Sequence, residues 1–164
     1  MARFFGDAET EAMVQKLWAL AAYSEAPGLV IDLNRTPGVQ AAYAAWDANF
    51  QSVEAANRVA DAIRSSIWDE IDRQPTIRYL ILVGDDRVIP SRRVQDVLPK
   101  DPALLESNYP DISEQSAMGQ ALRQNYSLTD DFYATRSLQF RRSVPFYLPD
   151  LSIGRLIENP TDVR

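Results

Sequence analysis

The sequence predicts an α/β fold in which a mostly parallel β-sheet is layered against flanking helices. Three observations indicate this. Apolar runs of strand length occupy residues 29–33 and 79–83, a long amphipathic segment at 52–73 separates them, and a third apolar run follows at 150–157. The order strand, long helix, strand is typical of a right-handed parallel crossover, and unbroken apolar runs are typical of strands covered on both faces. With 164 residues and 46% hydrophobic composition, the chain can build one core, so we expect a single domain over residues 1–164.

The N-terminal elements follow from helical spacing and from helix breakers. Asp7 can cap a first helix, and Pro27 with Gly28 ends it. Leu29–Leu33 is then expected to form a buried strand. The segment 41–50, AAYAAWDANF, combines helix-favouring alanines with two large aromatic residues and is expected to be irregular or briefly helical. The buried face of the first helix is expected to carry Met13, Val14, Leu17, Trp18, Leu20 and Ala21.

The clearest helix begins at Ser52, which can cap it, while Glu54 lies in the first turn, where the helix dipole favours anions. The helix should end near Arg73, before Pro75, and Tyr79–Val83 should follow as a buried strand. One apolar stripe runs along the helix through Ala56, Val59, Ala60, Ile63, Ile67 and Ile71.

Residues 91–128 are polar and contain prolines, and we expect either an excursion with its own short helix or a flexible loop. Regular structure is expected again at Asp130–Ala134, and Asp150–Ile157 should form the third core strand. The segment 159–162, NPTD, has the composition of a helix start.

Charge argues against nucleic acid and membranes as partners. Lys and Arg total 17 against 23 Asp and Glu, so the net charge of −6 opposes phosphate backbones and anionic lipid surfaces. No segment approaches the roughly 20 apolar residues of a membrane span, and no signal segment is expected in the chain as written. Two basic clusters lack interleaved aromatic residues and are expected to be solvated: Arg87, Arg92 and Arg93, and Arg136, Arg141 and Arg142.

The chain contains neither cysteine nor histidine. Disulfides, thiolate metal sites and cysteine nucleophiles are therefore excluded within these residues. The missing imidazole also removes the commonest general base and the commonest zinc ligand. Phosphate-binding loops of the Walker and Rossmann types are absent. Lys16, in the first helix, and Lys100, between prolines, are poorly placed to act as the base for a serine.

The acidic pair Asp85 and Asp86 follows the strand 79–83, at the edge where α/β proteins place ligands. The pair could belong to a structural framework, in which Gly84 makes a turn, Asp85 caps backbone donors and connects the loops, and Asp86 is solvated. With Asp130 or Asp131 it could instead bind calcium, most directly through Asp85 and Asp130. A carboxylate-only hydrolase is the third possibility, although spacing alone cannot show two facing acids.

Two further features concern the core. Phe132 and Tyr133 are expected to be core aromatics rather than pocket-lining residues. Arg155 follows a glycine within an apolar strand, so it must be paired or reach the sheet edge. We therefore expect a buried salt bridge from Arg155 to an acid such as Asp85 or Asp130.

Three segments in order, YLILVGDDRVIP, SLTDDFYA and YLPDLSIGRLIENPTD, resemble the gingipain-type cysteine peptidases, relatives of caspases and legumains. The resemblance covers about residues 29–164. The matching positions are Gly84, Asp85, Ile89 and Pro90; Thr129, Asp130 and Tyr133; and Ile153, Gly154 and Arg155.

The resemblance implies a caspase-like α/β sandwich, of which this chain would be the first, non-catalytic subdomain. It also implies that the catalytic histidine and cysteine lie downstream, so no catalytic residue is carried over and the chain alone is expected to be inactive. The implied partners are the downstream catalytic subdomain and, for the parent protein, a peptide substrate. No cofactor is implied, and the parent would be secreted or at the cell surface. The excursion at 91–128 is longer than the family connection. The alternative is a stand-alone module whose acidic loops bind a cation or a protein partner.

Overall fold

The computed structural model describes residues 7–25, 27–96, 112–141 and 144–156 of the chain. The excursion's central residues 97–111, with Lys100, and the expected helix start at 159–162 lie outside the described residues. The elements, in chain order, are α1 (Asp7–Ala21), the 3-10 helix η1 (Leu33–Arg35), α2 (Pro37–Ala48), α3 (Val53–Arg73), β1 (Tyr79–Val83), β2 (Arg92–Gln95), α5 (Ala117–Arg123), β3 (Tyr126–Thr129), α6 (Asp131–Ala134), β4 (Gln139–Arg141), β5 (Val144–Phe146) and β6 (Ser152–Leu156).

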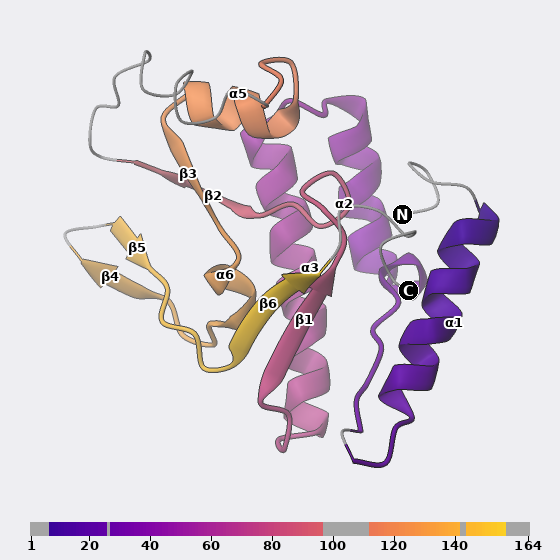
Figure 1. Ribbon diagram of the computed structural model, residues 1–164. Helices are drawn as coiled ribbons and strands as arrows, with labels where there is room; N and C mark the ends of the chain where they lie inside the picture. The colour runs from indigo at the N-terminus through magenta and orange to yellow at the C-terminus, as the bar shows by residue number, and fades with distance from the viewer. Residues whose placement is uncertain (1–6, 26, 97–111, 142–143, 157–164) are drawn as a thin grey trace.

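The long helix α3 is the centre of the fold, and α2 packs along it (Figure 1). Its predicted N-cap is confirmed, because the Ser52 hydroxyl accepts a hydrogen bond from the Ala55 amide at 3.1 Å. The predicted apolar stripe is buried in the core along the whole helix. The core is therefore built around one amphipathic helix, as the sequence predicts. The buried residues of α3 are Ala55, Ala56, Val59, Ala60, Ile63, Ile67 and Ile71.

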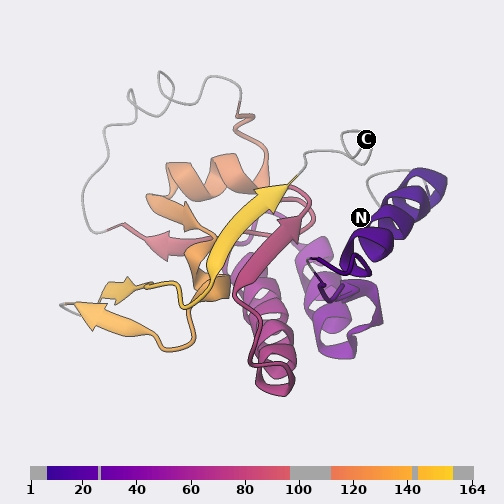
Figure 2. The same cartoon turned by 60° about the horizontal axis from the view of Figure 1, so that its bottom comes forward.

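Beside α3, β1 and β6 form a parallel two-stranded sheet, with Tyr79 opposite Ser152 and Val83 opposite Leu156. Two further strand pairs, β2 with β3 and β4 with β5, are antiparallel. The β4–β5 hairpin projects from the body of the molecule (Figure 2). The predicted α/β class, with a small parallel sheet flanked by helices, is confirmed.

In the described residues, the core covers one face of the β1–β6 sheet and the other face carries exposed side chains, which corrects the expectation of two covered faces. Leu82 is buried, and Leu80 and Ile153 pack against the core around α3. On the opposite face, Tyr79 is 76% exposed and Leu156 is also exposed. Because side chains alternate along a strand, an unbroken apolar run places half of its side chains on each face. The apolar run therefore predicts the strand correctly, but it does not show which faces of the sheet are covered.

The expected strand at residues 29–33 is not present. Residues 29–32 form no regular secondary structure, Leu33 begins η1, and Leu29 is exposed. The Asp32 carboxylate accepts a hydrogen bond from the Asn34 amide at 3.0 Å, which begins the turn of η1 in place of a continuing strand. The expected crossover from this segment to β1 therefore lacks its first strand.

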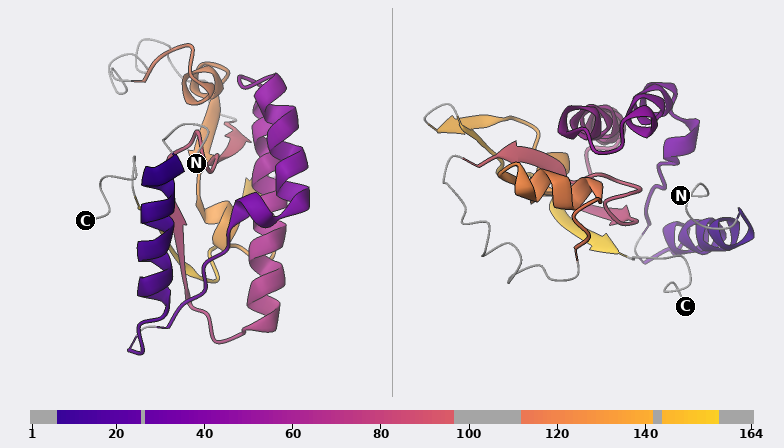
Figure 3. Two further views of the ribbon diagram at one scale, coloured as in Figure 1. Left: turned by 90° about the vertical axis from the view of Figure 1, so that its right-hand side faces the viewer. Right: turned by 90° about the horizontal axis from the view of Figure 1, so that it is seen from above.

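Helix α1 forms as predicted but buries little of its apolar face. Met13 is buried, whereas Trp18 and Leu20 are exposed. The helix lies at the periphery of the molecule (Figure 3). No helix in the described part of the chain combines the length and hydropathy required to cross a membrane.

The segment that combined alanines with aromatic residues is a full helix, α2, of 12 residues. Trp46 is fully buried, and its ring stacks on that of Phe50 with a centroid separation of 4.6 Å. Its indole N–H donates to the Phe50 carbonyl oxygen at 2.9 Å. The large aromatics thus anchor the C-terminal end of the helix instead of breaking it.

Within 91–128, the described residues form β2, α5 and β3. Ser116 caps α5, because its hydroxyl accepts from the Gly119 amide at 2.9 Å. A Cβ at Gly119 would lie 2.2 Å from the Ser113 carbonyl oxygen, so only glycine allows this close approach. The short helix therefore packs tightly against the chain that leads into it.

Candidate functional site: an ion-pair framework at the strand ends

The candidate site lies at the carboxyl ends of β1 and β6. Gly84 ends β1 with φ of 130°, a conformation that favours glycine, and its amide donates to the Leu156 carbonyl oxygen at 3.0 Å. The chain then turns through Asp85, whose carbonyl oxygen accepts from Val88 and Ile89 at 3.0 and 2.9 Å. This turn brings Pro90 and β2 back toward α3 and places polar side chains beside the strand ends.

Arg155 on β6 makes the expected salt bridge with Asp130. Its Nε donates to Asp130 Oδ2 at 2.8 Å and its Nη2 to Oδ1 at 2.7 Å, a bidentate arrangement. A third bond runs from Nη1 to the Gly84 carbonyl oxygen at 2.7 Å. The Ser91 hydroxyl completes the group by donating to Asp130 Oδ1 at 2.8 Å. One guanidinium thus joins β6, the end of β1 and the start of α6.

The pKa values of both partners reflect this contact. Burial alone would raise the pKa of Asp130, but the hydrogen bond and charge of Arg155, with smaller contributions from Ser91 and Arg93, bring it below its ordinary value of 3.8. Burial alone would lower the pKa of Arg155, but Asp130 more than offsets that, and the pKa is raised. Each group is therefore held in its charged form.

A second, deeper pair joins Asp86 to Arg93 and corrects two sequence expectations. Asp86 was expected in solvent but is only 8% exposed, and Arg93 was expected in a solvated basic cluster but has a fully buried side chain. Arg93 Nη1 and Nη2 donate to Asp86 Oδ1 and Oδ2 at 2.8 and 2.6 Å. The Ser91 amide also donates to Asp86 Oδ1 at 2.9 Å. The turn after β1 directs Asp86 inward, where β2 supplies its countercharge.

Asp85 and Asp131 make local contacts. Asp85 accepts from the Arg87 amide at 2.9 Å, the expected cap, and pairs with the exposed Arg87 guanidinium. It does not pair with Arg155, so the expectation that Asp85 connects the loops is wrong in the geometry observed. Asp131 begins α6, and its amide donates to Thr129 Oγ1 at 3.2 Å. The structure brings Asp86, Asp130 and Arg155 into the buried network and leaves Asp85 and Asp131 at its margin.

Tyr133 is a core residue, as expected, and its hydroxyl donates to the Pro90 carbonyl oxygen. Burial raises the pKa of this hydroxyl well above 10.0, so it remains a neutral donor. Arg64 of α3, which the sequence analysis did not single out, donates through Nε to the Phe132 and Thr135 carbonyl oxygens, both at 3.0 Å. Arg64 thereby satisfies carbonyl groups at the end of α6. The sequence feature that could have identified Arg64 is its position beside the apolar stripe of α3.

These residues define the ion-pair framework: Gly84, Asp86, Pro90, Ser91, Arg93, Asp130, Tyr133 and Arg155. Its two carboxylates, the buried Asp86 and the partly buried Asp130, are each engaged by a guanidinium. In the described part of the chain, no three Asp or Glu side chains gather into a group that could hold a metal ion. A hollow of about 240 Å³ lies beside Asp85 and Asp86, lined also by Ile112 and Met118. These contacts connect the ends of β1 and β6 with the turn after β1 and the start of α6.

A family model described as peptidase family C25, the gingipain family, matches residues 19–163. The chain belongs to this family of cysteine peptidases. Comparisons with curated proteins and with solved structures find no match. The predicted resemblance to gingipains is therefore confirmed over nearly the whole chain.

The family assignment agrees with the observed contacts, because the three motifs of this gingipain-family chain meet in space. Gly84 and Pro90 come from the first motif, Asp130 and Tyr133 from the second, and Arg155 from the third. Their bonds to one another cross between motifs: Arg155 with Gly84 and Asp130, and Tyr133 with Pro90. These five motif residues form one hydrogen-bonded unit, in which the Tyr133 amide also donates to the Asp130 carbonyl oxygen at 2.9 Å.

Proposed function

We propose that this chain is the N-terminal, non-catalytic subdomain of a gingipain-like cysteine endopeptidase. The single observation that carries the proposal is compositional: a chain of a cysteine peptidase family contains no Cys and no His among its 164 residues. Cysteine peptidases need a thiolate nucleophile and a base to activate it. Both groups must then come from sequence other than these residues.

The ion-pair framework gives this subdomain a physical role. Groups that bind ligands in α/β proteins lie at the carboxyl ends of parallel strands. Here Arg155 connects the ends of β1 and β6, and Asp86 with Arg93 fixes the turn that follows β1. A rigid strand edge of this kind can hold a neighbouring catalytic loop in register.

The open face of the β1–β6 sheet supports a partner in the parent protein. Tyr79, Ile81 and Leu156 present exposed apolar side chains on that face. Parallel sheets in proteins are ordinarily covered on both faces. We expect the catalytic subdomain to cover this face and a peptide to be the substrate of the assembled enzyme. The net charge of −6 argues against nucleic acid and anionic membranes as partners.

The proposal is tested in the parent polypeptide. A Cys and a His outside these residues should each be essential for hydrolysis. Arg155→Met should lower kcat without abolishing folding. The substitution removes the contacts that hold the ends of β1 and β6 in position, and we propose that these strand ends support the catalytic Cys and His. Arg87→Met, which breaks an exposed pair, is the matched control and should leave kcat unchanged. A parent enzyme that needs no such Cys, or that ignores Arg155→Met while remaining folded, would contradict the proposal.

A further inference from the structure

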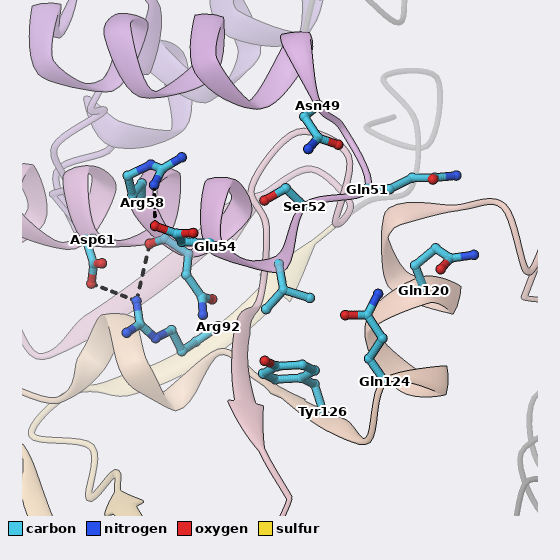
Figure 4. Close-up of a pocket in the computed structure, with 12 residues that line it drawn as sticks. Asn49, Gln51, Ser52, Glu54, Arg58, Asp61, Arg92, Gln120, Gln124 and Tyr126 are labelled. Atoms are coloured by element: carbon cyan, nitrogen blue, oxygen red, sulfur yellow. Dashed lines mark hydrogen bonds and ion pairs between the residues drawn. The ribbon is translucent and has the colours of Figure 1, made fainter.

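A polar groove lies beside the N-terminal half of α3, and none of its lining residues belongs to the ion-pair framework. Its volume is about 660 Å³, within the range of pockets that hold small ligands. The groove runs between the N-terminal half of α3 and the α5–β3 segment (Figure 4). We call it the amide groove and define it by Asn49, Val53, Glu54, Asp61, Gln124 and Tyr126.

The charges that line the amide groove cancel. Arg58 pairs with Glu54 at 2.7 Å, and Arg92 pairs with Asp61 at 2.7 Å. Two acids and two bases therefore contribute no net charge, although the chain as a whole carries −6. An ionic ligand would have to displace one of these partners, so the groove favours a neutral ligand.

The polar side chains of the groove that take no part in the two ion pairs suit a ligand rich in hydrogen-bonding groups. In the part of the chain that the structure describes, the Gln124 and Asn49 carboxamides and the Tyr126 hydroxyl make no side-chain hydrogen bond. Each carboxamide offers both donors and an acceptor, and the hydroxyl offers both roles. Val53 is the one aliphatic side chain of the lining, which leaves little for an apolar ligand to contact.

Tyr126 adds a flat surface. Figure 4 shows its ring between Gln124, which extends beside it, and the Arg92 side chain on the other side. A pyranose ring presents an apolar face of C–H groups and a rim of hydroxyls. An aromatic face matches the former, and carboxamides match the latter.

From these observations we propose that the amide groove binds a neutral oligosaccharide, with Tyr126 under one sugar ring, Gln124 bonded to the hydroxyls of that ring, and Asn49, at the other end of the groove, bonded to the hydroxyls of another ring. The site is independent of the proposed peptidase role, because none of its residues belongs to the ion-pair framework. One wall of the groove, with Gln124 and Tyr126, comes from the excursion at 91–128, which is also the part of the chain that exceeds the connection expected of the family; the opposite wall comes from α3. The excursion would then add carbohydrate recognition to the peptidase subdomain.

The test is NMR titration of the isotopically labelled chain. The probes are neutral trisaccharides of glucose, mannose, galactose and N-acetylglucosamine, with a sulfated trisaccharide and trialanine for comparison. At least one neutral trisaccharide should shift the amide signals of Gln124 and Tyr126 saturably. Tyr126→Ala and Gln124→Ala should each weaken that binding by about tenfold, equivalent to the stacking or hydrogen bond removed.

Matched variants keep the test decisive. Tyr23→Ala and Gln15→Ala change exposed residues away from the groove and should bind as the original chain does. Tyr126→Phe retains the ring and should lose less affinity than Tyr126→Ala. Should Tyr126→Ala fail to fold, Tyr126→Phe and the exposed Gln124→Ala carry the test. No saturable shift with any neutral trisaccharide, shifts outside the groove, or binding of only trialanine or the sulfated sugar would overturn the proposal.

Discussion

Arg155 and Asp130 form a bidentate ion pair across 25 residues of sequence, and the same guanidinium bonds the Gly84 carbonyl oxygen. Both side chains are mostly buried, at 22% and 25% exposure. A buried pair of this kind is costly to break on one side, because the remaining charge loses its partner without regaining water. The pair is therefore a sensitive point for testing how the fold is held together.

Arg155→Met should destabilise the chain by about 2–4 kcal/mol, because it leaves Asp130 partly buried and unpaired. Arg87→Met removes a guanidinium that is half exposed, and it should cost less than about 1 kcal/mol. Urea unfolding followed by circular dichroism measures both. Equal midpoints for the two variants would contradict the structural role assigned to Arg155.

Stability should fall in acid in a way that depends on Asp130. The folded-state pKa of Asp130 is lowered below the ordinary value of 3.8, so the carboxylate stabilises the fold above that value. The contribution is lost as the pH falls through the lowered pKa. Urea midpoints measured from neutral pH downward should show this loss in the original chain and a smaller slope in Asp130→Asn. A carboxyl signal of Asp130 that titrates above 3.8 by NMR would contradict the assignment.

Asp86 and Asp85 should respond very differently to the same change. Asp86→Ala leaves the buried Arg93 guanidinium without its carboxylate partner and should lower the free energy of unfolding by about 3–5 kcal/mol. Asp85→Ala breaks a contact with an exposed partner and should cost about 1 kcal/mol or less. Thermal unfolding of the two variants gives the comparison directly. A larger loss for Asp85→Ala would mean that the buried pair contributes less than its geometry indicates.

Calcium binding is the test of the alternative in which acidic loops bind a cation. Asp85, Asp86 and Asp130 are each engaged by an arginine, so we expect no saturable heat on titration with calcium. Isothermal calorimetry makes the measurement. Tight binding that disappears in Asp85→Ala or Asp130→Ala would favour the binding-module alternative.

The elements that could be predicted from the sequence are those set by local periodicity. The stripe from Ala56 to Ile71 fixed α3, and the runs that became β1 and β6 were found within two residues. The Ser52 cap was visible because capping depends on a side chain three residues from its partner. The pairing of Arg155 with an acid could also be expected, because an arginine within an apolar strand requires one.

What could not be predicted depends on contacts distant in sequence. Asp85 and Asp86 are chemically identical neighbours, and only the direction of the turn after Gly84 decides which one is buried. Arg93 was assigned to a solvated cluster because the sequence does not show that the same turn directs its partner, Asp86, into the interior. The run 29–33 has the composition of a strand, but a strand also needs a neighbour with a free edge, which local sequence does not report.

We propose that this chain positions a catalytic centre that is formed by residues outside it. The proposal is tested by incubating the purified 164-residue chain with fluorogenic peptides that carry lysine or arginine before the cleavage point. We expect no hydrolysis above that of a mock purification, and no labelling by thiol-reactive peptidase probes. Hydrolysis that co-purifies with the chain, scales with its concentration and is lost on a single substitution within it would show that the proposed role is wrong.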